Sequence, residues 1–307
     1  MDSDQFSTAA GSSQAPTTGE SKPTAAIVAW WHLIRGGNAL LSAVAGLIGL
    51  YLTGGDLQSL AALSATAAPL LIAAFGNIDN DLCDLPLDRL WKTYRPLASG
   101  AIGTVAARRV AVVAALLGLI AAGVSGTAPL VIAFGVLALL AVYNRRLSAV
   151  PLVGNVAVAV MGGLPILYGG LCARSTGADA LAVAAFGAVI AFWLHLSREI
   201  LKDVLDVAGD GVMGRRTLAI VLTPETATRW AALPLIPAGA FALWLGTGDW
   251  LGILYIFGVS LTVIPTLLIA AAQCAFNPHE MVALRWTVGL KLVMLGGLIW
   301  MILGKAA

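Results

Sequence analysis

Acidic side chains gather in two short segments of this chain. The sequence contains 16 Asp and Glu residues among its 307 residues, and half of them fall in these two clusters. The first cluster consists of Asp79, Asp81, Asp84 and Asp88, and the second of Glu199, Asp203, Asp206 and Asp210. A single cluster could be an ordinary solvated loop. Two clusters in a chain so poor in charge favour a chemical role, because ionisable groups near a membrane are costly and usually functional.

The spacing within each cluster places its members on one face of a helix. Asn80, Asp84 and Asp88 are four residues apart, and Asp81 joins the edge of that face, seven residues before Asp88. The second cluster advances in steps of four, three and four. Residues three or four apart are neighbours on a helix, and like charges at this spacing repel one another. We therefore expect a cation to neutralise each cluster.

Carboxylate and amide oxygens are the ligands that Mg²⁺ prefers, and Mg²⁺ usually combines one or two protein carboxylates with phosphate oxygens of a substrate. The two clusters thus predict a Mg²⁺ cofactor that is shared with a phosphorylated ligand. The candidate metal ligands are Asn80, Asp81, Asp84, Asp88, Asp203, Asp206 and Asp210.

Basic residues are interleaved with the acids. Arg89, Lys92 and Arg95 follow the first cluster, while Arg198 and Lys202 lie within the second. A diphosphate bridged by Mg²⁺ needs this mixture, because the metal binds some oxygens and Lys or Arg binds the others. Lys202 and Arg95 are the strongest candidates. The full set predicted to bind a diphosphate or an acceptor is Asn38, Lys92, Arg95, Arg145, Arg146, Asn155, Arg198 and Lys202.

The elements that must position these residues are membrane helices. Hydrophobic residues make up 59% of the chain and charged residues 11%, with a mean hydropathy of +0.89. A soluble fold of this size could not hide that much apolar surface. The apolar runs are long and continuous, which excludes the short alternating strands of a membrane barrel. The composition predicts an all-α polytopic membrane protein, preceded by a disordered tail over residues 1–24.

Nine apolar stretches are long enough to span a bilayer, which takes about 20 residues. Basic residues lie mostly on one side of these spans, with 16 of the 18 Lys and Arg on the side of the N-terminus. This asymmetry predicts that the N-terminus and both acidic clusters face the cytoplasm at the cell membrane. The predicted spans are 27–52, 59–79, 104–124, 127–145, 150–172, 180–200, 226–246, 250–273 and 284–304.

The run Asn80-Asp81-Leu82-Cys83-Asp84-Leu85-Pro86-Leu87-Asp88 resembles the NDxxDxxxD motif of UbiA-type intramembrane prenyltransferases. Arg95-Pro96-Leu97-Ala98-Ser99-Gly100 is similar to that family's RPLxSG segment, and Asp203, Asp206 and Asp210 resemble its second aspartate motif. Tyr143 and Pro151-Leu152-Val153-Gly154-Asn155 are similar to the region between the motifs. The resemblance covers residues 27–304.

The resemblance implies nine helices around a central cavity, forming a single domain over residues 25–307. It also implies a Mg²⁺-dependent reaction with a prenyl diphosphate donor. Two metal ions on the acidic faces would neutralise the leaving group, with Asp84 and Asp203 as catalytic residues. Tyr143 is the third predicted catalytic residue, because its ring could stabilise a cation-like carbon.

The run Arg198-Glu199-Ile200-Leu201-Lys202-Asp203 looks like the digeranylgeranylglyceryl phosphate synthase branch of the family. That branch implies transfer of a geranylgeranyl group to geranylgeranylglyceryl phosphate in ether-lipid synthesis. Gly36 and Ser148 depart from residues usual in the family, and these departures bear on the acceptor. An aromatic acceptor such as 4-hydroxybenzoate is the first alternative, and a cation-coupled transporter is the second. We expect the bilayer as a partner, but neither nucleic acid nor an obligate protein partner.

Overall fold

The computed structural model describes residues 22–173, 177–212, 214–248 and 250–306, and within these ranges its regular secondary structure consists of helices alone, joined by turns and loops. The predicted all-α membrane class is confirmed. The elements are α1 (Lys22–Leu33), α2 (Gly36–Leu52), α3 (Leu60–Trp91), α4 (Thr104–Ser125), α5 (Thr127–Arg145), the 3₁₀ turn η1 (Leu147–Ala149), α6 (Val153–Cys172), α7 (Ala178–Val212), α8 (Leu218–Val221), α9 (Pro224–Trp230), α10 (Leu235–Leu245), α11 (Ile253–Gly258), the π-helical segment η2 (Val259–Val263), α12 (Ile264–Phe276) and α13 (Glu280–Ala306).

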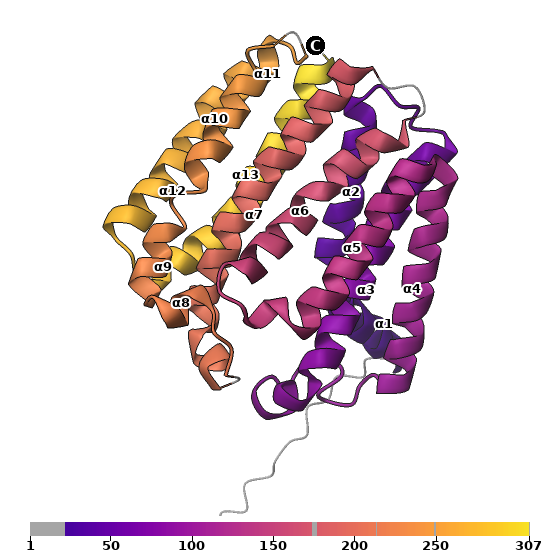
Figure 1. Ribbon diagram of the computed structural model, residues 1–307, viewed down its shortest axis with the longest axis vertical. Helices are drawn as coiled ribbons and strands as arrows, with labels where there is room; N and C mark the ends of the chain where they lie inside the picture. Colours follow the sequence, from indigo (N-terminus) through magenta and orange to yellow (C-terminus); the bar gives the residue numbers. More distant parts are fainter. Residues whose placement is uncertain (1–21, 174–176, 213, 249, 307) are drawn as a thin grey trace, which may run out of the picture.

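The helices form two groups that are joined along the middle of the molecule. Helices α1 to α6 lie on one side and α9 to α12 on the other, with α7 and α13 between them (Figure 1). Helix α2 packs on α3 and α6, α6 packs on α7, α7 packs on α13, and α13 returns to α2. This closed circuit of contacts surrounds the interior of the bundle.

Seven of the described helical segments are long and apolar enough to cross a membrane, and the bent pair α1–α2 raises the number to as many as eight. The predicted count of nine is therefore not confirmed. The difference lies in the predicted span 226–246, which is interrupted between α9 and α10. Pro234 stands at the break, where its ring disfavours a continuous helix.

The predicted span 27–52 is bent by 59° between α1 and α2. Arg35 lies at the bend with φ of 48°, in the left-handed region that side chains rarely adopt. The Asn77 amide donates to the Ile34 carbonyl (2.8 Å), and Arg35 donates to Asn77 (3.1 Å) and Asn80 (2.9 Å). Polar residues of α3 thus hold the bend and place the first turn of α2 beside the first acidic cluster.

Of the tail predicted over residues 1–24, residues 1–21 lie outside the described residues, and α1 already begins at Lys22. Helices α3 and α7 run past the span ends predicted at residues 79 and 200, with lengths of 32 and 35 residues. A bilayer needs about 20 residues. The additional turns carry the acidic clusters, so both clusters are helical. We call the end of the bundle where α3 and α7 terminate, at the bottom of Figure 1, the motif end.

Small residues allow α2 and α6 to approach closely. A Cβ added at Gly169 would collide with the Gly46 carbonyl, and one added at Gly49 would collide with the Ile166 carbonyl. Close contact through glycine is typical of helix pairs in membranes. It brings α2 and α6 together on the wall of the interior cavity.

Candidate active site

A cavity of about 700 Å³ occupies the interior of the bundle. Polar residues from both acidic clusters line it at the motif end. Apolar side chains line it further along the helices, including Pro69 and Ile72, which lie three to four turns before Asp84 on α3. An apolar chamber with charged groups at one end suits a ligand that has a charged head and a hydrocarbon tail.

The four acids of the first cluster do not share one environment. Asp84 lines the cavity, together with the neighbouring amide Asn80. Asp81 and Asp88 are instead buried beside the cavity, with 4% and 2% of their surface exposed. Arg95 forms ion pairs with Asp88 (2.7 Å) and Asp81 (3.3 Å). Burial acts to lower the pKa of the Arg95 guanidinium, but Asp81 and Asp88 outweigh it and raise the pKa above its usual value. Arg95 therefore stays charged and fastens the segment after α3 to the helix.

The second cluster presents its acids to the cavity more uniformly. Glu199, Asp203, Asp206 and Asp210 all line it. The Asn155 amide of α6 donates to Asp203 (2.8 Å), and Lys202 pairs with Asp206 (2.9 Å) one turn along α7. The carboxylates are thus oriented by neighbours that also face the cavity or its small side pocket.

Arg215 joins the two clusters, although it is 131 residues from Asp84 in sequence. Its guanidinium forms an ion pair with Asp84 and lies 3.6 Å from Asp210. Arg215 follows the second cluster in the sequence but is not among the predicted site residues. Its position five residues after Asp210 was the available signal, but spacing alone cannot show which cation reaches across to α3.

Most of the other predicted residues also meet in the cavity. Asn38, Lys92, Tyr143, Arg198 and Lys202 line it. Tyr143 lies close enough to Lys202 and Asp203 for their charges to act on its hydroxyl. Predicted site residues from α2, α5 and α7 therefore lie together in one cavity.

Arg145 and Arg146 do not line this cavity. Arg145 donates to both carboxylate oxygens of Asp79 at 2.9 Å, and its side chain is 54% exposed. Asp79 also accepts from Asn144 (2.9 Å). Arg146 is exposed at the end of α5. The α5 helix turns these guanidinium groups outward, so Arg145 instead ties α5 to α3.

Three basic residues that are not among the predicted site residues line the cavity as well. They are Arg35, Arg215 and Lys291. Among the described residues, seven Lys or Arg and five Asp or Glu line the cavity, so its charge favours an anion even before a metal ion is added.

Within the described ranges, no three His, Cys, Asp or Glu side chains come together in a way that could hold a metal ion by themselves. The donor set nevertheless fits Mg²⁺, which takes one or two carboxylates and completes its coordination with phosphate oxygens and water. Asp84, Asp203, Asp206 and Asp210 line the cavity. Buried Asp88 Oδ1 has no hydrogen-bond partner.

Residues 39–277 match the family model described as the UbiA prenyltransferase family. This chain belongs to that family. The predicted family is thereby confirmed, and the protein is a membrane prenyltransferase that transfers alkyl groups other than methyl. The family membership decides against the cation-coupled transporter.

Relatives within the family support one branch. The chain is 34% identical to a digeranylgeranylglyceryl phosphate synthase of Methanoculleus marisnigri, over 76% of this chain and 82% of the relative. It is 32% identical to the protein of the same name from Pyrococcus abyssi, over 64% and 69% of the two chains.

Solved structures share the fold of this family member. A solved structure of digeranylgeranylglyceryl phosphate synthase matches with a TM-score of 0.77 and 23% identity, covering 91% of this chain and 98% of the other. A UbiA homologue from Archaeoglobus fulgidus bound to GPP and Mg²⁺ matches with a TM-score of 0.63 and 16% identity, covering 89% and 99%. At these identities the likeness establishes the fold.

Proposed function

We propose that this prenyltransferase moves a geranylgeranyl group from its diphosphate to geranylgeranylglyceryl phosphate, in a Mg²⁺-dependent step of ether-lipid synthesis. The observation that carries the proposal is the cavity itself, where acids from both clusters gather at one end of an apolar chamber that seven basic side chains also line. The relatives named for this reaction support the choice of acceptor.

The diphosphate of the donor would lie at the motif end. Lys92, Arg95, Lys202 and Arg215 line this end and can donate to phosphate oxygens. When bound, Mg²⁺ would neutralise the charge that develops on the leaving diphosphate, held by Asp84 and the second-cluster acids Asp203, Asp206 and Asp210. Asn80, Asp81 and Asp88 are the other predicted metal ligands on α3. Asn80 lines the cavity, while Asp81 and Asp88 are buried beside it.

In the reaction, the allylic C–O bond breaks and its electron pair leaves with the diphosphate. A hydroxyl oxygen of the acceptor forms the new bond to that carbon, and its proton passes to the departing diphosphate. Asp203, oriented by Asn155, stands where it can help to hold the acceptor or the leaving group. The Tyr143 ring can stabilise positive charge on the carbon by cation–π attraction.

The isoprenoid tails would occupy the apolar part of the cavity, between α2, α3, α6 and α13. Residues such as Ile72, Leu164 and Met294 line this region. A dry chamber protects the reactive carbon from water, which would otherwise hydrolyse it. We further propose that the motif end faces the cytoplasm, because 16 of 18 basic residues lie on that side of the predicted spans.

Product analysis tests this function. The purified protein in lipid nanodiscs is incubated with geranylgeranyl diphosphate, Mg²⁺ and a mixture of geranylgeranylglyceryl phosphate and 4-hydroxybenzoate. Mass spectrometry should find the diether phosphate. A prenylated aromatic ring with no ether lipid would overturn the acceptor while leaving the donor chemistry intact.

A further inference from the structure

We propose that Lys291 of α13 and Arg198 of α7 form a second anion site, distinct from the diphosphate site, that binds the phosphate of the acceptor. This inference rests on the proposed function and adds the residues that select the acceptor. Lys291 plays no part in the acidic clusters and lies near the middle of α13.

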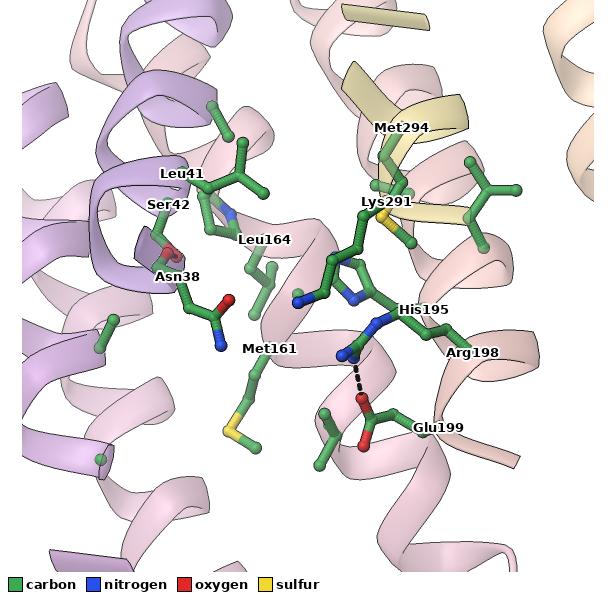
Figure 2. Close-up of a pocket in the computed structure, with 18 of the residues that line it drawn as sticks. Asn38, Leu41, Ser42, Met161, Leu164, His195, Arg198, Glu199, Lys291 and Met294 are labelled. Atoms are coloured by element: carbon green, nitrogen blue, oxygen red, sulfur yellow. Dashed lines mark hydrogen bonds and ion pairs between the residues drawn. The ribbon is translucent and has the colours of Figure 1, made fainter. Parts of the chain in front are cut away.

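The two cations lie together in the cavity wall. Figure 2 shows the Lys291 ammonium and the Arg198 guanidinium directed into the same part of the cavity, with the Asn38 amide facing them from α2. Their charges are close enough to act on each other. Met161 and Leu164 of α6 form the apolar wall beside them. Three helices thus contribute to one polar position inside an otherwise apolar region.

These cations have more donors than the protein satisfies. One nitrogen of the Arg198 guanidinium donates to Glu199, but its Nε is buried with no hydrogen-bond partner. Across the described residues, no ion pair or hydrogen bond engages the Lys291 ammonium. Glu199 supplies one negative charge against two positive charges. Unpaired charge at membrane depth is costly, so the arrangement favours an anionic ligand.

His195 lies one turn before Glu199 and also faces this position (Figure 2). An imidazole adds hydrogen-bonding capacity and no negative charge in either protonation state, so the local charge remains positive.

The position of the pair fits an acceptor rather than the donor's diphosphate. Arg198 lies one helical turn before Lys202 and two turns before Asp206, which is about 6 and about 12 Å deeper along α7 at 1.5 Å per residue. A glyceryl phosphate carries its hydroxyl and phosphate on one three-carbon backbone. With its phosphate on Lys291 and Arg198, the hydroxyl would point back toward the acidic clusters, where the allylic carbon is released.

A phosphate matches the pair better than a carboxylate does. It brings close to two negative charges and three acceptor oxygens at neutral pH, against a guanidinium fork and an ammonium point charge. Arg145 and Arg146, which the sequence predicts to bind the diphosphate or the acceptor, do not line the cavity and therefore do not contribute to this site.

The test compares two acceptors that differ only in the phosphate. Initial rates are measured in nanodiscs with saturating geranylgeranyl diphosphate and Mg²⁺, for geranylgeranylglyceryl phosphate and for geranylgeranylglycerol. In Lys291→Met, the KM for the phosphorylated acceptor should rise about 10- to 100-fold, as expected for loss of a charged hydrogen bond. The KM for the donor and for the dephosphorylated acceptor should stay within about twofold of the wild-type value. If geranylgeranylglycerol is not turned over, its inhibition constant replaces its KM.

Lys291→Arg should keep most of the preference for phosphate, because it keeps the charge. Lys305→Met is the matched control on the same helix, since Lys305 is exposed at the end of α13 and does not line the cavity. A normal donor KM in Lys291→Met reports that the variant is folded.

The outcomes separate this inference from the proposed function. If wild-type protein makes no diether phosphate, the proposed function is wrong and this inference is wrong with it. If wild-type protein makes it but Lys291→Met keeps the full preference for phosphate, only the inference is overturned. A rise in donor KM alone would instead place the pair in the diphosphate site, and an equal loss with both acceptors would make Lys291 structural.

Discussion

The two acidic clusters have similar spacing on α3 and α7, but the structure uses them differently. On α3, Asp81 and Asp88 are buried against Arg95, and Asp79 is bound by Arg145, so Asp84 alone among the four acids lines the cavity. On α7, all four acids line it. Similar spacing therefore does not give the acids of the two clusters the same roles. The neighbouring helices and loops determine which carboxylates form internal ion pairs and which face the cavity.

The comparison teaches that α3 both fastens the fold and contributes chemistry, while α7 mainly contributes chemistry. Arg35 pairs with Asp81 at 3.0 Å and Arg95 pairs with Asp88 at 2.7 Å, so the α3 acids anchor the segments on either side of the helix. On α7 the basic partner of Asp206 is Lys202 of the same helix. Substitutions in the two clusters should consequently affect stability and rate in different proportions.

The largest effect should come from removing the divalent cations that we propose both clusters help to bind. Chelation with EDTA should abolish turnover, and Mg²⁺ should restore it, because the charge on the leaving diphosphate would otherwise be neutralised by basic residues alone. Product formation is measured by mass spectrometry before and after restoration. Full activity in EDTA would show that the acids do not bind a metal.

The next largest effect should come from the acids that face the cavity. Asp84→Ala and Asp203→Ala should each lower the rate by about 10²-fold or more, because each removes a group that stabilises the leaving charge. Both proteins should remain in the membrane fraction with nearly unchanged thermal stability. Near-normal turnover in either variant would show that the acids of its cluster form a solvated polar face and take no part in the reaction.

The buried acid of α3 should behave differently. Asp88→Asn removes the charge that pairs with Arg95, and breaking a buried ion pair costs about 3–5 kcal/mol. We expect a clear drop in the unfolding temperature, measured in detergent by the loss of monomer on size-exclusion chromatography. Asp203→Asn is the matched control on α7. Equal stability of the two variants would contradict the division between anchoring and cavity-facing acids.

The smallest effect should come from the pair outside the cavity. Arg145→Met removes an ion pair with Asp79 whose basic partner is half exposed, and such pairs contribute roughly 1 kcal/mol or less. The KM values for donor and acceptor should stay within about twofold of wild type. A large rise in the KM for the acceptor would show that Arg145 does bind the acceptor, as the sequence predicts.

The sequence by itself determined the class of protein and most of the charged residues that line its cavity. Long apolar runs require a membrane, and the spacing of Asp84, Asp203, Asp206 and Asp210 places carboxylates on helical faces, because a helix repeats every 3.6 residues whatever surrounds it. The interleaving of acids and bases also indicated Lys202, and the resemblance to the family indicated Tyr143; both share the cavity with these acids.

Only the tertiary structure decided which of these residues meet and which are used elsewhere. Helical periodicity shows that residues share a face, but it does not show what that face contacts. The pairing of Arg215 with Asp84, the outward turn of Arg145 and the convergence of Lys291 with Arg198 all depend on helices far apart in sequence. Long basic side chains can reach in several directions from one backbone position, so their roles follow from the packing of the whole bundle.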